Sequence, residues 1–268
     1  FHGIRAAAAV VASSFDVVSA VGVHVYKQLG CGLLALPNAA DVDVRDVSAS
    51  HVLCAMFISG DAGATDGTSY AVLDVRTARS VTVAGVLVAH VLSTPSWTGA
   101  ANPDKPSCSG SAVRVTHTRK AQVRDVVADH VVTVGHGGLV CATLVEEVLI
   151  GNVSCDNVST TGHGGVVFVS HGTRADVQGV WVHGAASGLG GGAVALHDVP
   201  VVDARNITAS HCHSHTDGGA VSIARAAAVV LAHVAANDSH AATGSGGAVH
   251  VAVNDHATVV VSDVATAN

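Results

Sequence analysis

The chain has 268 residues, a formal net charge of −7 with histidine counted as neutral, and only 12% charged side chains. This charge gives no electrostatic reason to expect nucleic acid or an anionic membrane as a partner. No apolar run reaches the length of a membrane span, because Arg5 and Asp16 flank or interrupt the best candidate. Val, Ala and Gly dominate and aromatic residues are few, so we expect a core of small and β-branched side chains.

Residues 1–110 predict the irregular N-terminal coils of a repeating structure. An Asp or Gly precedes a valine at Asp16–Val17, Asp46–Val47 and Gly85–Val86, at intervals of 30 and 39 residues, and the next valine of this kind follows 40 residues later at Val126. Three prolines and several turn-forming residues at 93–110 indicate an inserted loop that leaves the coil.

Residues 111–268 predict regular coils. A set of paired glycines and a column of apolar residues recur at the same spacing. The residue before each member of the apolar column is Asp, Asn, Gly or His. These four types tolerate a positive φ at low cost, so we expect a tight left-handed corner at the same place on every coil. The paired glycines lie at 137–138, 164–165, 191–192, 218–219 and 246–247, and the apolar column, with a period of 27, is Val126, Val153, Val180, Ile207 and Val234.

Short strands, a constant period and a recurring corner together predict an all-β fold, a right-handed single-stranded parallel β-helix of about nine coils. Each coil stacks about 4.8 Å above the last, and apolar columns fill the interior. A β-sandwich also has regularly spaced strands, but they do not hold one register over successive coils. We expect one continuous solenoid domain, whose open ends contact other chains or further copies in a longer protein or a filament.

The GGAV and GGVV units resemble the GGA-[ILV] repeats of polymorphic outer membrane protein autotransporters, and the chain is also similar to the pectate-lyase-like β-helix superfamily. The resemblance covers 111–268 well and 1–110 loosely, and it implies adhesion at a cell surface. We therefore expect a non-catalytic extracellular module, structural or adhesive, that presents a rigid face to surface glycans or proteins. A fibre or spike of a virus would share this fold and would be distinguished by threefold assembly.

A polysaccharide lyase or hydrolase is the alternative function. Two GHGG stretches, at 135–138 and 162–165, resemble a GHG element of polygalacturonases, whereas the other sequence elements of those enzymes are missing. Asp176 and Asp203 share a column on adjacent coils, but two carboxylates are too few to establish hydrolysis or a Ca²⁺ site. A cleft with at least three converging acidic or basic side chains on adjacent coils would favour the enzyme.

The stretch HCHSHTDGGAV at 211–221 raises the question of a metal site. His211, His213 and His215 project from one side of a bend, and His240 on the next coil could add a ligand for Zn²⁺. The 18 histidines are spread over most coils, however, so we prefer a turn in which histidine occupies exposed positions. We expect no cofactor, and neither Zn²⁺ nor Ca²⁺.

Four asparagines lie in Asn-x-Ser/Thr sequons, which predicts N-linked glycans and a eukaryotic secretory pathway: Asn152, Asn157, Asn206 and Asn237. Two of them, Asn152 and Asn206, also stand at the predicted corner, where asparagine is favoured for its backbone conformation. Asn157 and Asn237 are therefore the preferred glycosylation sites.

The six cysteines permit disulfides. Cys31 with Cys54, and Cys108 with Cys141, are the pairs whose coil positions could approach each other. Cys155 falls in a column of small apolar residues, which predicts a buried thiol. Trp181 is expected to face outward, where its indole could stack on a sugar.

Overall fold

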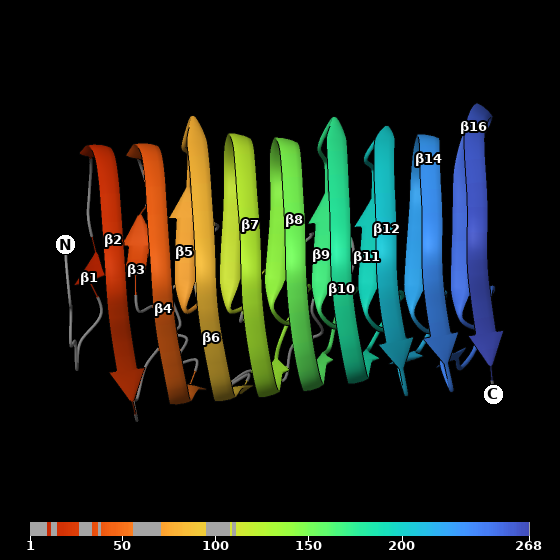
Figure 1. Ribbon diagram of the computed structural model, residues 1–268, viewed down its shortest axis with the longest axis horizontal. Coiled ribbons are helices and arrows are strands. Elements are labelled where there is room, and N and C mark those ends of the chain that lie inside the picture. The colour runs from red at the N-terminus through yellow and green to blue at the C-terminus, as the bar shows by residue number, and fades with distance from the viewer. Residues whose placement is uncertain are drawn as a thin grey trace, which may run out of the picture.

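The computed structural model describes residues 10–11, 15–26, 34–36, 39–55, 71–94, 108 and 111–267. Their regular structure is entirely β-strand, and these residues include no helix suited to crossing a membrane. The strands wind into a parallel β-solenoid (Figure 1). In Figure 1 the long strands run downward in front and the short strands run upward behind as the chain advances, which makes the coil right-handed.

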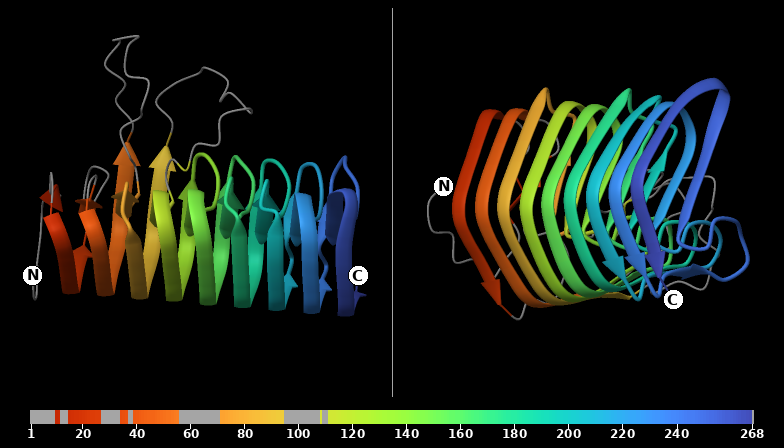
Figure 2. Two further views of the ribbon diagram at one scale, coloured as in Figure 1. Left: turned by 90° about the horizontal axis from the view of Figure 1, so that it is seen from above. Right: turned by 45° about the vertical axis from the view of Figure 1, so that its right-hand side comes forward.

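Two parallel ladders run the length of the solenoid. The long strands, bent at corners, form the first: β2 (Phe15–Tyr26), β4 (Ala39–Ala55), β6 (Ser80–Thr94), β7 (Val113–Thr133), β8 (Val140–Thr160), β10 (Arg174–Ser187), β12 (Val201–Ser210), β14 (Val221–Asn237) and β16 (Val249–Ala267). Short strands, together with the first residues of β7, β8, β14 and β16, form the second: β1 (Val10–Val11), β3 (Leu34–Leu36), β5 (Leu73–Arg76), β9 (Val167–Ser170) and β11 (Val194–His197). Two further short strands, β13 (His213–Ser214) and β15 (His240–Ala241), pair beside the end of β10. Figure 2 shows the coils stacked one behind another from the N-terminal to the C-terminal end.

The stretch 111–267 is described without a gap and makes about six turns with a period of about 27 residues. β2, β4 and β6 continue the long ladder toward the N-terminus. The sequence predicts about nine coils for the whole chain, and about six of them lie in the continuously described stretch 111–267. Most of the inserted loop expected at 93–110, namely 95–107 and 109–110, lies outside the described residues.

The predicted apolar columns fill the interior. Val126 pairs with Val153, Val153 with Val180, Val180 with Ile207 and Ile207 with Val234, and all five side chains are buried. Cys155 is buried in register with Val182, as its column predicts. Small β-branched residues suit this interior because each one contacts its equivalents on the coils above and below.

The predicted corner is confirmed from the second coil onward. The residues that precede the apolar column have φ between 52° and 67°: Asp46, Gly85, Asp125, Asn152, Gly179, Asn206, His233 and Asp263. The first coil differs from the prediction, because Val23 rather than Val17 pairs with Val47. Both valines follow a residue type that suits a corner, and only the apolar spacing of Val18, Ala20 and Val23 matches the later coils.

The coil has more left-handed corners than the single one that the sequence predicted. Five residues after the first corner, a second repeats with φ between 46° and 68° at His51, His90, His130, Asn157, Gly184, His211 and Asp238. A third follows the short strands, with φ between 52° and 59° at Thr77, His117, Leu144, His171, Asp198 and Arg225. Within the described ranges eight histidines have positive φ, which gives a structural reason for much of the histidine content.

The two glycines of each pair have different roles. The first, such as Gly164 with φ 62°, makes a fourth left-handed corner. The second lies directly against the backbone of the next coil: a Cβ on Gly165 would meet the carbonyl oxygen of Gly192 at 2.0 Å, and one on Gly192 that of Gly219 at 2.0 Å. The motif therefore brings successive backbones into contact where no side chain fits.

Candidate functional site

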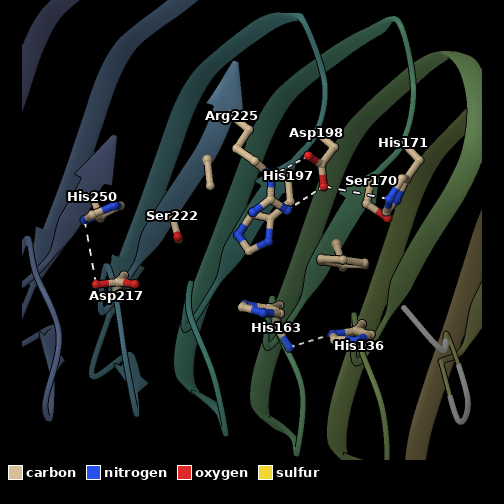
Figure 3. A pocket seen from close by; sticks show the side chains of 12 residues that line it. His136, His163, Ser170, His171, His197, Asp198, Asp217, Ser222, Arg225 and His250 are labelled. Carbon is tan, nitrogen blue, oxygen red and sulfur yellow. Dashed lines mark hydrogen bonds and ion pairs between the residues drawn. The ribbon is translucent and has the colours of Figure 1, made fainter. Parts of the chain in front are cut away.

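A cavity of about 390 Å³ is hollowed into the outer side of the short-strand ladder (Figure 3). Its lining repeats with the coils, so that columns of equivalent residues form its walls and floor. We call it the histidine cavity. It is lined by His136, His163 and Asp217 on one wall, by Ser170, His171, His197, Asp198, Ala224 and Arg225 on the other, and by Phe168, Ser222 and His250 on the floor.

Aromatic rings make a stacked group at one end of the histidine cavity. The rings of His136 and His163 lie on consecutive coils with their centroids 5.3 Å apart and an interplanar angle of 15°. Phe168 stacks on His136 at 4.5 Å, and His197 meets His163 edge-on at 4.3 Å. The pairing of His136 with His163 as neighbours follows from the repeat, because both precede the paired glycines.

Backbone hydrogen bonds fix the protonation state of two of these rings. The N–H of His163 donates to Nδ1 of His136 at 2.9 Å, and the N–H of Gly190 donates to Nδ1 of His163 at 3.0 Å. A backbone N–H is always a donor, so each Nδ1 is an unprotonated acceptor and the neutral ring carries its hydrogen on Nε2.

Burial keeps three histidines of the cavity, His136, His163 and His197, uncharged at neutral pH. Burial, together with the neighbouring histidine in the case of His136 and His197, lowers the pKa of His136 and of His163 to about 4 and that of His197 to about 3. These three rings therefore present neutral hydrogen-bonding groups to the cavity.

The third corner supplies the charged residues of the second wall. His171, Asp198 and Arg225 occupy this corner on consecutive coils, where the left-handed conformation turns their side chains outward. Both oxygens of Asp198 accept from Arg225, with Nη2 and Oδ2 2.5 Å apart, and His171 Nε2 lies 3.8 Å from Oδ2. Hydrogen bonding to Arg225 lowers the pKa of Asp198, which stays ionised and paired.

The first wall of the cavity lacks a side chain at one position, between His163 and Asp217. Gly190 stands in the column of His163 and Asp217, and a Cβ at this position would lie 3.2 Å from Ser222 Oγ. Asp217 Oδ1 accepts from the N–H of Ser245 at 2.7 Å and lies 3.8 Å from His250 Nδ1. An opening remains between His163 and Asp217.

Two buried polar atoms face the cavity with no hydrogen-bond partner among the described residues. These atoms are Nε2 of His197, a residue 9% exposed, and Oγ of Ser170, a residue 1% exposed. The two residues lie side by side in register on β11 and β9. Buried polar atoms are paired in the great majority of cases, so this pair marks the place where a ligand or water would complete the hydrogen bonding.

The structure joins Cys108 and Cys141 in a disulfide, one of the two pairs that the coil positions favour. Cys141 shares the floor column with Phe168, so the bond lies next to the N-terminal end of the histidine cavity. Cys31 lies outside the described residues, and its pairing with Cys54 stays a prediction.

Reduction of this disulfide is expected to lower the free energy of unfolding by about 2–4 kcal/mol, because the bond closes a loop with a sequence separation of 33 residues. Urea unfolding followed by circular dichroism, with and without reductant, measures the change. The double variant Cys108→Ala with Cys141→Ala is the control. It should lose stability to the extent that the Cys108–Cys141 bond accounts for, and any further loss on addition of reductant would be assigned to the predicted Cys31–Cys54 bond.

The four histidines considered for zinc are not brought together. Only His213 and His240 approach closely, with their Nδ1 atoms 3.1 Å apart. His211 occupies the second corner instead, where its ring contacts that of His183 at 5.0 Å and its Nε2 lies 3.6 Å from Asp238. His215 is exposed, and no group of three or more His, Cys, Asp or Glu that could hold a metal occurs in the part of the chain that the structure describes.

All four sequon asparagines are exposed. The preference for Asn157 rested on its lying away from a corner, and this reason was wrong: Asn157 has φ 53° at the second corner. A structural explanation therefore exists for three of the four, Asn152, Asn157 and Asn206. Asn237 alone is not in the left-handed region, and it stays the preferred site of a predicted N-linked glycan.

Most of the cavity was not anticipated from the sequence. For the cavity, the repeat predicted only that His136 lies beside His163. It also placed Asp176 beside Asp203 outside the cavity, where Arg205 pairs with Asp203 at 2.5 Å. It did not identify Ser170, His197, Asp198 and Arg225. The sequence did contain a signal for them, the same period of 27. It aligns His171, Asp198 and Arg225 in one column, in which an acidic residue is followed on the next coil by a basic one.

No known protein family, curated protein or solved structure matches the chain.

Proposed function

We propose that the protein is a non-catalytic, extracellular adhesive module that binds glycans in the histidine cavity. The observation that carries this proposal is the buried pair of His197 Nε2 and Ser170 Oγ, which face the cavity without partners. Sugar hydroxyls both donate and accept, so they match neutral imidazole and hydroxyl groups that stand side by side on adjacent coils. The volume of about 390 Å³ is in the range of small-molecule sites.

The charges of the cavity also favour an uncharged, hydroxyl-rich ligand. Arg225 is held by both oxygens of Asp198, so neither charge is fully available to an ionic ligand. The stacked histidines are neutral at pH 7 because their pKa values lie near 4 or below. Recognition would therefore depend on hydrogen bonds rather than on net charge.

The resemblance to GGA-[ILV] repeats of autotransporter passengers and to pectate-lyase-like β-helices supports the same proposal, since it implies adhesion at a cell surface. The sequons support secretion and glycosylation. Contacts of the solenoid ends with other chains or further copies remain a prediction of the fold.

A carbohydrate-active enzyme is the second candidate, because the cavity meets the criterion of converging acidic and basic side chains on adjacent coils. Asp198 and Asp217 line it together with Arg225. Hydrolysis needs one carboxyl group that stays protonated to act as the acid. Asp198 cannot fill this role while Arg225 lowers its pKa, so Asp217 would have to be the acid.

Binding of a panel of neutral oligosaccharides, measured by calorimetry, tests the proposal. His197→Phe keeps a ring of similar size but removes the hydrogen-bonding nitrogen, and Ser170→Ala removes the hydroxyl. Each change is expected to weaken binding by roughly tenfold, the equivalent of about one hydrogen bond. Gly190→Ala places a methyl group in the opening of the first wall and should weaken binding by steric exclusion.

The exposed variant His183→Gln, outside the cavity, is the matched control and should bind as the parent does. Equal binding by His197→Phe and the parent would contradict a site in the cavity. Release of new reducing ends from the oligosaccharides, abolished by Asp217→Asn, would replace the adhesive function with the enzymatic one.

A further inference from the structure

Trp181 exposes its indole on the outside of the long-strand ladder, away from the histidine cavity. The residue is 47% exposed and lies on β10 between the first and second corners. Its register partners on the neighbouring coils are Ser154 and Thr208. These side chains are too small to cover the indole, so the ring remains accessible from solvent.

The corner beside Trp181 is shaped to accommodate the ring. Gly179 occupies this corner, whereas the same position holds Asn152 on the coil before and Asn206 on the coil after. A Cβ on Gly179 would lie 3.0 Å from Cη2 of Trp181 and 3.2 Å from Oδ1 of Asn152. Glycine therefore lets the edge of the indole and the amide of Asn152 converge over the corner.

The surroundings of the ring are polar rather than apolar. A hollow of about 480 Å³ includes the indole, and its other lining residues are Asn152, Gln178, Gly179, Asn206, Thr208 and His233. The amide nitrogens of Asn152 and Gln178 donate to Asp125 and Asp176, at 3.0 and 2.8 Å. This orientation turns the two amide oxygens away from those carboxylates, where they can accept hydrogen bonds from a ligand.

We propose that this hollow, the Trp181 platform, is a second binding site that takes a pyranose ring. The apolar C–H face of the sugar would stack on the indole, while its hydroxyls contact the amides of Asn152 and Asn206 and the hydroxyl of Thr208. A protein partner would need a wider apolar area than one indole surrounded by amides provides. The site goes beyond the proposed function, because it shares no residue with the histidine cavity.

Unglycosylated protein from a bacterial host tests the platform. The sequence has two tryptophans, so Trp97→Phe leaves Trp181 as the only indole fluorophore. Titration with cellotriose and with chitotriose, whose rings have flat apolar faces, is expected to give a saturable change in emission. The expected Kd is about 0.1–10 mM, as befits one ring on an open surface.

Gly179→Asn is the decisive variant, because asparagine occupies this corner on both neighbouring coils and tolerates its positive φ. The fold should be retained while the added side chain displaces the indole, and we expect the Kd to rise at least fivefold. Leu87→Ala is the matched control, since Leu87 is 51% exposed in the same column and should not affect binding. No saturable change at 20 mM sugar, on the order of twice the weakest expected Kd, or unchanged binding by Gly179→Asn, would overturn the proposal.

Failure of the platform and failure of the cavity are distinguishable. His197→Phe in the Trp97→Phe background should leave the fluorescence titration unchanged even though it weakens binding in the cavity.

The pyranose could belong to a separate glycan or to a glycan of this chain on Asn152 or Asn206. Protein from a eukaryotic secretory host separates the two sources. If the chain's own glycan covers the indole, enzymatic deglycosylation should increase acrylamide quenching of Trp181. If the ligand is a separate glycan, quenching should be the same before and after deglycosylation.

Discussion

Acidification from pH 7.5 to pH 4 is expected to lower the free energy of unfolding by several kcal/mol. His136, His163 and His197 have folded-state pKa values of about 4, 4 and 3, below the usual value of 6.5. The unfolded chain therefore binds protons that the folded chain does not. Stability is fully present above pH 6.5 and is lost as the pH falls toward the folded pKa values.

Each buried histidine contributes a slope of about 1.4 kcal/mol per pH unit in this window, which amounts to about 2–3 kcal/mol per histidine between pH 6.5 and pH 4. The geometry gives the same direction, because a proton on Nδ1 of His136 or His163 would face a backbone N–H that now donates to it. Asp198 acts in a lower window. Its pKa is lowered by Arg225, so its contribution is present above about 3.8 and is lost at more acid pH.

Urea unfolding at a series of pH values measures these contributions. His197→Phe removes one titrating ring whose Nε2 has no hydrogen bond to lose, so the slope between pH 6.5 and 4 should become shallower by about one third. Leu92→Ala changes an exposed side chain that binds no proton, and should leave the slope as in the parent. A slope equal in the parent and in His197→Phe would show that His197 is not buried in the neutral form.

The interior of the solenoid was predictable from the sequence because a coil repeats one local environment. Val153, Val180 and Ile207 occupy the same place on successive coils, so a burial requirement at one place recurs at a fixed interval. The conformational requirement of the corner recurs in the same way, and only Asn, Asp, Gly and His satisfy it cheaply. The second corner has the same composition, and its column could have been identified five residues downstream of the first.

The cavity was less predictable because its residues differ from one coil to the next. His163, Gly190 and Asp217 share one column but have unlike side chains, so the period reveals their alignment and not their purpose. The cavity also needs two separate columns to face each other. The distance between these two columns depends on the path of the chain from the second corner to the paired glycines. Exposed residues such as His211 and His215 lie on this path.

Replacement of Gly165 by alanine is expected to destabilise the fold by roughly 3 kcal/mol or more. A Cβ at this position would meet the carbonyl oxygen of Gly192 at 2.0 Å. The Cβ would be attached directly to the backbone of one coil, and the oxygen belongs to the backbone of the next coil, which is stacked on it. No flexible side chain can move aside, so relief requires the coils to separate and to lose pairing and packing nearby.

Gly151→Ala is the matched control, because a Cβ there would have its nearest neighbour, the carbonyl oxygen of Gln178, at 3.8 Å. This contact is ordinary, and Gly151 is not in the left-handed region, so alanine should be neutral or stabilise by up to about 0.5–1 kcal/mol. Urea unfolding of both variants gives the comparison. Equal stability of the two would mean that successive backbones do not approach as closely at the paired glycines as at the interior strands. A selective loss in Gly165→Ala would show that the second glycine is retained for contact between coils, independently of the positive φ that requires the first.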